Sequence, residues 1–81
     1  MLVNDMTPNM DKTRTIFRVR MRSGREQAGL TQHGLDNKAK LPWSTCSQYE
    51  GGFRSPSISV LVKIADALAL STDYLLGRKE E

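Results

Sequence analysis

Apolar side chains recur at helical spacing through most of this chain, and no long stretch alternates with a period of two. A helix predicted over residues 14–28 carries its apolar face at Phe17, Met21, Gly24 and Ala28. Gly29 supplies the stop. Gly24 costs about 1 kcal/mol relative to Ala in mid-helix, so we expect another side chain to pack closely over it. The pattern predicts an all-α fold.

Start and stop residues divide the middle of the chain into two short helices. Thr31 is placed to cap a helix over residues 32–39 by accepting a hydrogen bond from a following amide. Pro42 suits the start of the next helix, which covers residues 43–50 and is closed by a glycine pair. The side chains that we expect to face inward from these two helices are Leu35, Ala39, Cys46 and Tyr49.

Two further helices are predicted in the C-terminal part. Ser57 or Ser59 caps a helix that continues through residue 69, and Ser71 caps a short one over residues 72–76. The longer helix gives the strongest helical signal in the chain, from its apolar set of Ile58, Leu61, Val62, Ile64, Ala65 and Leu68. The sequence therefore predicts a compact bundle of five helices.

The chain divides into a flexible N-terminal arm over residues 1–13, one domain over residues 14–77 and a charged tail over residues 78–81. No apolar run approaches the roughly 20 residues that span a bilayer. The first residues are too polar for the apolar segment of a signal peptide. We therefore expect a cytoplasmic protein without contact to a membrane.

Positive charge is concentrated in the middle of the chain. Between residues 14 and 54, eight Lys and Arg residues stand against three Asp and Glu residues, a net charge of +5, whereas each flanking part has a net charge of −1. Such a distribution fits a polyanionic partner better than an evenly basic surface would.

The residues that usually carry catalysis are too isolated to form an active site. Cys46 has no second cysteine for a disulfide or a metal and no base spaced to activate it, so we expect a core thiol. His33 has no other ligand at metal-binding spacing and is expected on the surface. No glycine-rich phosphate loop or acid–base pair is present. The sequence predicts neither an enzyme nor a bound cofactor or metal.

An ordered set of segments resembles the helix-turn-helix domain of the phage repressor and Cro-like (XRE) family over roughly residues 17–77. The segments are GLTQ at 29–32, STCSQYEGG at 44–52, RSPS at 54–57, VKIADAL at 62–68 and STDYLLG at 71–77. The resemblance implies a lambda repressor-like fold. It also implies a transcriptional regulator, expected to be a repressor, whose recognition helix begins at about Pro42, ends at Glu50 and enters the major groove of DNA.

The resemblance places Trp43, Ser44 and Gln48 against base edges. A Gln amide pairs with adenine N6 and N7 together, which makes Gln48 the main candidate for discrimination, although an exposed Gln can also stay solvated. Ser44 accepts from or donates to most base edges and therefore tunes a preference. Trp43 is open to two interpretations, because it either contacts a thymine methyl or the sugar wall or folds back over Gly24 or Pro42.

Phosphate contacts fix the register of such a domain on DNA. The resemblance implies them for Arg25, Thr31, Gln32, Thr45, Gly52 and Arg54. Glu50 is expected to orient Arg25 toward a phosphate, and a purely structural ion pair between the two is compatible with that role. The remaining arginines of the first helix, Arg14, Arg18 and Arg22, are expected to act only as a general positive surface.

Four residues depart from the usual pattern of the resembling family. Asp36 replaces a small Ala between the two motif helices, so either Asp36 tilts outward with rearranged packing or the domain is less stable. Lys40 replaces a turn Gly, and a left-handed conformation there costs about 1 kcal/mol. Cys46 replaces a larger aliphatic residue and Gly24 replaces Leu.

A domain of this size contacts one half-site, so we expect a homodimer on a near-palindromic operator. The residues expected at its interface are Leu70, Tyr74, Leu75 and Leu76, which alternatively close the core. A different class of function also stays open, in which the chain is an antitoxin or accessory module whose main partner is another protein.

Overall fold

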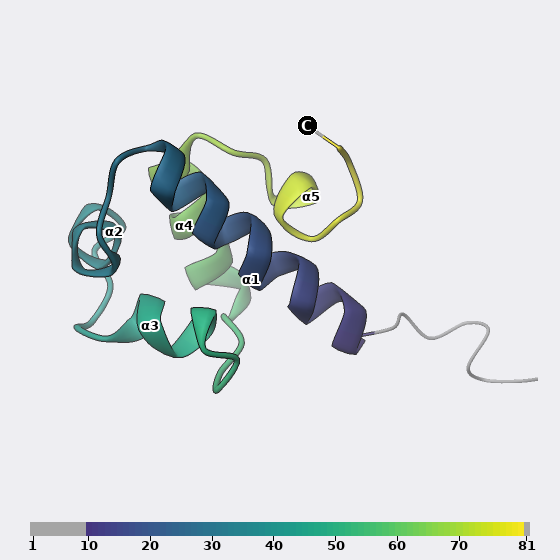
Figure 1. Cartoon of the computed structure of the whole chain (residues 1–81), viewed down its shortest axis with the longest axis horizontal. Helices are drawn as coiled ribbons and strands as arrows, with labels where there is room; N and C mark the ends of the chain where they lie inside the picture. The colour runs from purple at the N-terminus through teal and green to yellow at the C-terminus, as the bar shows by residue number, and fades with distance from the viewer. Residues whose placement is uncertain (1–9, 81) are drawn as a thin grey trace, which may run out of the picture.

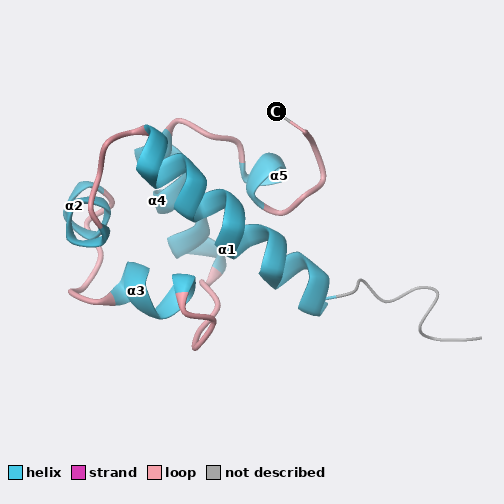
Figure 2. Ribbon diagram, in the orientation of Figure 1, coloured by secondary structure: helices cyan, strands magenta, loops and turns pink. Residues whose placement is uncertain are grey.

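The computed structural model describes residues 10–80, which form five helices and no strand (Figures 1 and 2). This confirms the all-α prediction. The helices are α1 (Met10–Gln27), α2 (Gln32–Lys38), α3 (Thr45–Glu50), α4 (Ile58–Leu68) and α5 (Thr72–Leu75). Helix α1 packs against α3, α4 and α5, and α2 packs against α3 and α4. Figure 1 shows α1 crossing the front of the molecule, with α3 along its lower edge.

Helix α1 begins at Met10, four residues before the predicted start, so the helix takes in the end of the segment expected to be an arm. No Gly or Pro interrupts residues 10–13, and nothing local stops the helix from extending there. The rest of that expected arm, residues 1–9, lies outside the described residues. At the other end Gly29 has φ +72°, as expected of a helix stop.

The core lies between α1 and the four shorter helices. Its largest fully buried side chains are Met21, Leu35, Cys46, Ile64 and Leu75. Phe17 is also buried and meets Tyr49 edge to face, with ring centroids 6.3 Å apart. The predicted inward positions of α1, α2 and α3 are confirmed, except that Ala28 is exposed in the turn after α1.

The close packing expected over Gly24 is provided by the connection between α4 and α5. A Cβ at Gly24 would lie 2.7 Å from Leu70 Cδ1 and 3.4 Å from Leu68 Cδ1. Trp43 does not fold back over Gly24, because its side chain is 75% exposed. Glycine at this position therefore lets α1 approach the leucines directly.

Helix α3 begins at Thr45, later than the predicted start at Pro42 or Trp43. Ser44 has φ +71°, a left-handed conformation that a continuous helix does not contain, and its side chain makes no capping hydrogen bond. The carbonyl of Pro42 instead accepts from the Thr45 amide at 3.2 Å and the Thr45 hydroxyl at 2.7 Å. Pro42 thus closes a turn before α3.

Asp36 supplies the cap that Ser44 lacks. Its side chain is 3% exposed, and Oδ1 accepts a hydrogen bond of 2.8 Å from the Cys46 amide in the first turn of α3. Asp36 therefore does not tilt outward, which excludes the first of the two alternatives given for it. A carboxylate at the positive end of a helix is favourable, and here it joins α2 to the start of α3.

We expect Asp36→Ala to lower the free energy of unfolding by about 1 kcal/mol, because the Cys46 amide loses its capping partner. Asp36→Asn is the matched control, since its amide oxygen still accepts at the same place. Urea denaturation followed by circular dichroism measures both variants. Equal stability of Asp36→Ala and Asp36→Asn would show that the cap contributes nothing.

Lys40 has φ +58°, which confirms a left-handed non-glycine residue in the turn between α2 and α3. Ser57, not Ser59, caps α4 and accepts from the Val60 amide at 3.3 Å. Helix α5 ends one residue earlier than predicted, at Leu75, and the following Gly77 has φ +81°.

The apolar set predicted for α4 is only partly buried. Ile64, Ala65 and Leu68 lie in the core, whereas Ile58 is 84% and Val62 is 45% exposed. The helix has apolar residues around more of its circumference than α1, α2 and α5 cover. Helical spacing identified the helix correctly but did not identify its buried face.

Candidate nucleic-acid interface

Helix α3 presents one side to the core and the other to solvent. Cys46 and Tyr49 are buried, whereas Ser47 and Gln48 lie on the accessible side. The segments that flank the helix are more open, since Trp43, Gly52, Phe53 and Arg54 are all exposed. Figure 1 shows this helix and the loop after it at the lower edge of the molecule, away from α5.

A polar cluster behind α3 joins three helices. Arg25 on α1 donates to both carboxylate oxygens of Glu50 on α3, from Nε to Oε2 at 2.6 Å and from Nη2 to Oε1 at 3.0 Å. Gln32 at the start of α2 donates from Nε2 to Glu50 Oε1 at 3.0 Å. Arg25 Nη1 also donates to the Leu30 carbonyl at 2.8 Å. The Glu50 carboxylate thereby fixes the end of α3 against α1 and α2.

The ionisation of this cluster follows from its partners. Burial acts to raise the pKa of Glu50, but the hydrogen bonds from Arg25, Gln32 and Cys46 outweigh it and hold that pKa below its ordinary value. The hydrogen bond to Glu50 raises the pKa of Arg25. Burial, together with the bond from Cys46 Sγ to Glu50 Oε2 at 3.2 Å, raises the pKa of Cys46 to about 12. Cys46 is therefore a protonated core thiol.

Several of the side chains predicted to contact phosphate are already engaged in hydrogen bonds within the domain. The Arg25 side chain points into the domain and only 9% of the residue is exposed, which favours the structural ion pair over a phosphate contact. Gln32 uses its amide nitrogen on Glu50. Thr45 is 6% exposed with its hydroxyl on the Pro42 carbonyl, so a contact from this side chain to phosphate is wrong. Thr31 caps α2 as predicted, accepting from the Gly34 amide at 2.9 Å.

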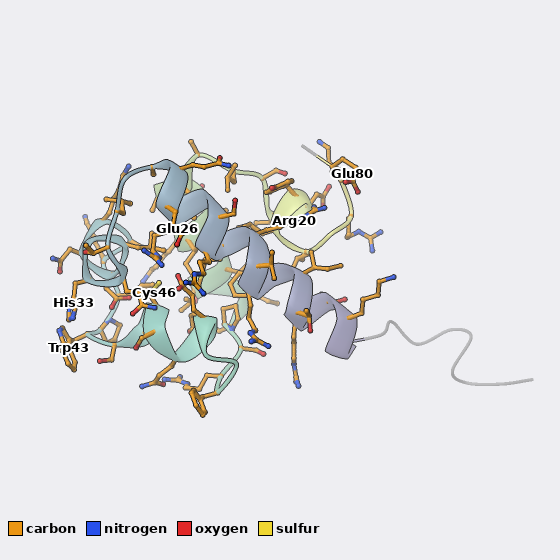
Figure 3. All side chains as sticks on the ribbon, in the orientation of Figure 1. Arg20, Glu26, His33, Trp43, Cys46 and Glu80 are labelled. Atoms are coloured by element: carbon orange, nitrogen blue, oxygen red, sulfur yellow. The ribbon has the colours of Figure 1, made fainter. Side chains whose placement is uncertain are left out.

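The three predicted base-reading residues lie along the accessible side of α3 and at its start. Trp43 packs against His33 of α2 in a tilted arrangement, with ring centroids 4.8 Å apart and planes 46° apart, and Figure 3 shows both rings at the same corner. Gln48 Oε1 accepts from Arg54 Nη1 at 3.2 Å, so Arg54 orients the amide. The amide nitrogen of Gln48 and the second lone pair of its oxygen are left for a ligand.

Arg18 of α1 lies against the loop after α3, which the sequence did not predict. Its Nε donates to the Glu50 carbonyl at 3.3 Å, and a Cβ at Gly52 would lie 3.1 Å from its Cζ and Nη1. Gly52 has φ +81°. The arginine stripe on α1 carried a signal for a basic surface, but only the fold brings Arg18 to the end of α3.

None of the four predicted dimer residues is well exposed, since Leu70, Tyr74 and Leu76 are half-buried. Leu75 is fully buried in the core, so its assignment to an interface is wrong. Leu70 packs over Gly24. Tyr74 lies under the Arg20 guanidinium at 4.4 Å from Cζ to the ring centroid. Large apolar side chains are instead exposed at Val19, Trp43, Phe53, Ile58 and Val62.

No group of three His, Cys, Asp or Glu side chains among the residues that the structure describes is arranged to hold a metal ion. None of the helices within residues 10–80 combines the length and the apolar character needed to cross a membrane.

Comparison with known proteins places this architecture in a family. The family model described as helix-turn-helix matches residues 21–75. The chain is 36% identical over 61 residues to the HTH-type transcriptional regulator ImmR of Bacillus subtilis, covering 75% of this chain and 48% of that protein. It is also 36% identical over 59 residues to the cryptic phage CTXphi transcriptional repressor RstR of Vibrio cholerae, covering 73% and 53%.

A solved structure agrees with these matches. The crystal structure of the hypothetical transcription factor NHTF from Neisseria superimposes with a TM-score of 0.77 at 26% identity, over 85% of this chain and 79% of that one. The chain belongs to the helix-turn-helix family of the phage repressor and Cro-like (XRE) type. It spans about half the length of the two regulators that it matches.

Proposed function

We propose that this chain is a sequence-specific DNA-binding transcriptional repressor, with α3 as its recognition helix. The observation that carries the proposal is the buried cluster of Arg25, Gln32 and Glu50, which fixes α3 against α1 and α2 while its other side stays open. A rigid helix with one accessible polar side can enter the major groove without rearrangement. Membership of the family and the regulators named above support the same function.

Gln48 is the residue proposed to read a base. It lies on the accessible side of α3, and its amide is already held by Arg54 at 3.2 Å, which lowers the cost of ordering it on DNA. Trp43 and Ser44 would contact the bases or sugars next to it. The exposed indole of Trp43 fits an apolar contact with a thymine methyl.

Two copies would be needed for useful specificity. One domain covers one half-site, and a palindromic operator presents two of them about 34 Å apart on the same face of DNA. The exposed pair Ile58 and Val62, one turn apart on α4, offers apolar surface for self-association that Leu75 cannot offer.

The experiment is fluorescence anisotropy with the DNA upstream of the protein's own gene and a scrambled duplex of equal composition. We expect wild type to prefer the upstream DNA and Gln48→Ala to lose about 1–3 kcal/mol on that duplex only. Gln27→Ala, which removes another exposed amide from α1, is the matched control and should bind as wild type does.

The proposal fails if wild type binds neither duplex below micromolar concentration at moderate salt, and a protein partner would then be sought. If Gln48→Ala loses the same binding free energy on both duplexes, the proposal of DNA binding stands, but Gln48 does not read sequence.

A further inference from the structure

Three arginines from two separate elements surround one cavity beside the end of α3. The cavity has a volume of about 300 Å³ and is lined by Arg14 and Arg18 of α1 and by Gly52, Arg54 and Ser55 of the loop after α3. Phe17 closes it on the core side. In the sequence the two arginine groups are separated by more than thirty residues, so only the fold brings them together.

Among the residues whose side chains the structure describes, 12–80, none of those lining this cavity is acidic. Within residues 10–80, the ion pairs of α1 involve Arg20, Arg22 and Arg25, and none involves Arg14, Arg18 or Arg54. Three like charges around one space repel one another, and an anion placed between them would remove that repulsion. The cavity therefore has the electrostatics of an anion site.

The backbone beside the cavity contacts and holds the Arg18 guanidinium. Gly52 has no side chain, and a Cβ there would lie 3.1 Å from Arg18 Cζ, so the guanidinium rests directly on the loop. Its Nε is held by the Glu50 carbonyl at 3.3 Å. A guanidinium held in this way loses less freedom when it binds, and its terminal nitrogens suit the paired oxygens of a phosphate.

We propose that Arg14, Arg18 and Arg54 form a phosphate-binding pocket that takes one backbone phosphate of DNA beyond the end of α3. This inference rests on the proposed function, since it is α3 in the groove that brings a strand to this edge. Arg14 and Arg18 then act as specific contacts and not as a general positive surface. The contact positions the domain and carries no sequence information of its own.

The test compares the salt dependence of DNA binding for Arg14→Gln/Arg18→Gln and for Arg78→Gln/Lys79→Gln. The control pair removes the same charge from exposed residues after α5. Each phosphate contact contributes about 0.9 to the slope of log K against log salt. We expect the pocket variant to lose about 0.9 of slope and to bind roughly eightfold more weakly at 0.1 M salt, on the upstream and scrambled duplexes alike.

Thermal unfolding checks that both variants are folded, and Arg14→Gln alone gives a second variant, because exposed Arg14 makes no ion pair within the described residues. It should lower the slope in the same direction. If wild type binds DNA but the pocket and control variants show the same slope of log K against log salt, the pocket is overturned. The proposed function would still stand. Absence of any wild-type binding to DNA overturns both.

A titration with inorganic phosphate at constant ionic strength separates a free anion from DNA. Shifts of the arginine Nε–H signals in nuclear magnetic resonance report occupation of the pocket. We expect wild type to bind free phosphate weakly, in the millimolar range, and the pocket variant to lose slope in the salt dependence of DNA binding. Tight phosphate binding together with an unchanged DNA slope would overturn the DNA assignment in favour of a small anionic ligand.

Discussion

Glu50→Ala is expected to lower the free energy of unfolding by about 3–5 kcal/mol, because it leaves the buried Arg25 without its counter-charge. The side chains of Arg25 and Glu50 are 11% and 6% exposed, and Gln32 and Cys46 also lose their acceptor. A domain of this size is stable by about 5–15 kcal/mol, so this one change removes a large part of the total. Urea denaturation followed by circular dichroism measures the loss.

Glu26→Ala is the matched control. Glu26 pairs with Arg22 at 3.4 Å on the surface of α1, with side chains 57% and 65% exposed, and such a pair contributes between 0 and about 1 kcal/mol. If Glu50→Ala costs no more than Glu26→Ala, the buried cluster does not hold α3 in place.

The pH dependence gives the same prediction a second readout. The folded state holds the pKa of Glu50 below its ordinary value, so the carboxylate stabilises the fold at neutral pH. That contribution is lost as the pH falls through the folded-state pKa. Wild type should therefore lose stability with acid more steeply than Glu50→Gln, which has no carboxylate to protonate. Parallel acid profiles of the two proteins would contradict the assignment.

Leu75→Ala is expected to cost about 2–5 kcal/mol, the second large effect, because it leaves a cavity in the core that no neighbour can fill completely. Leu75 is fully buried, whereas Val19, an aliphatic residue on α1 that lies outside the proposed site and self-association surface, is 62% exposed. Val19→Ala should therefore change the free energy of unfolding by less than about 0.5 kcal/mol.

Protein concentration separates a core role from an interface role for Leu75. A substitution in the core destabilises each copy by itself, so the loss of stability is the same at all protein concentrations. The loss caused by a substitution in an interface changes with protein concentration. Unfolding curves at low and high micromolar protein measure this. A loss of stability for Leu75→Ala that varies with concentration would return this residue to the dimer interface.

The sequence alone determined the features that depend on local chemistry. Thr31 and Ser71 cap helices because a hydroxyl reaches an amide three residues on, whatever the rest of the chain does. Gly29 and Gly77 end helices for a similarly local reason, since glycine takes a positive φ at little cost. The position of Gly24 on an apolar face required a close neighbour, although it did not say that Leu70 would be that neighbour.

Part of the candidate site was also predictable from the sequence. Helical spacing and the family resemblance placed Gln48 on a helix with Cys46 and Tyr49 facing inward, and burial confirms this orientation. The pairing of Arg25 with Glu50 came from the resemblance alone. No local pattern predicts a contact between residues so far apart in the chain.

Only the tertiary structure decided the remaining features, because they depend on which surfaces meet. Asp36 is buried since α3 brings the Cys46 amide to it, and a lone carboxylate on a helix cannot indicate such a partner. Leu75 and Ile58 are both aliphatic at helical spacing, yet one is in the core and the other in solvent. The pocket of Arg14, Arg18 and Arg54 exists because α1 passes the loop after α3. Local sequence fixes where helices begin and end, whereas their packing decides which side chains are left to bind.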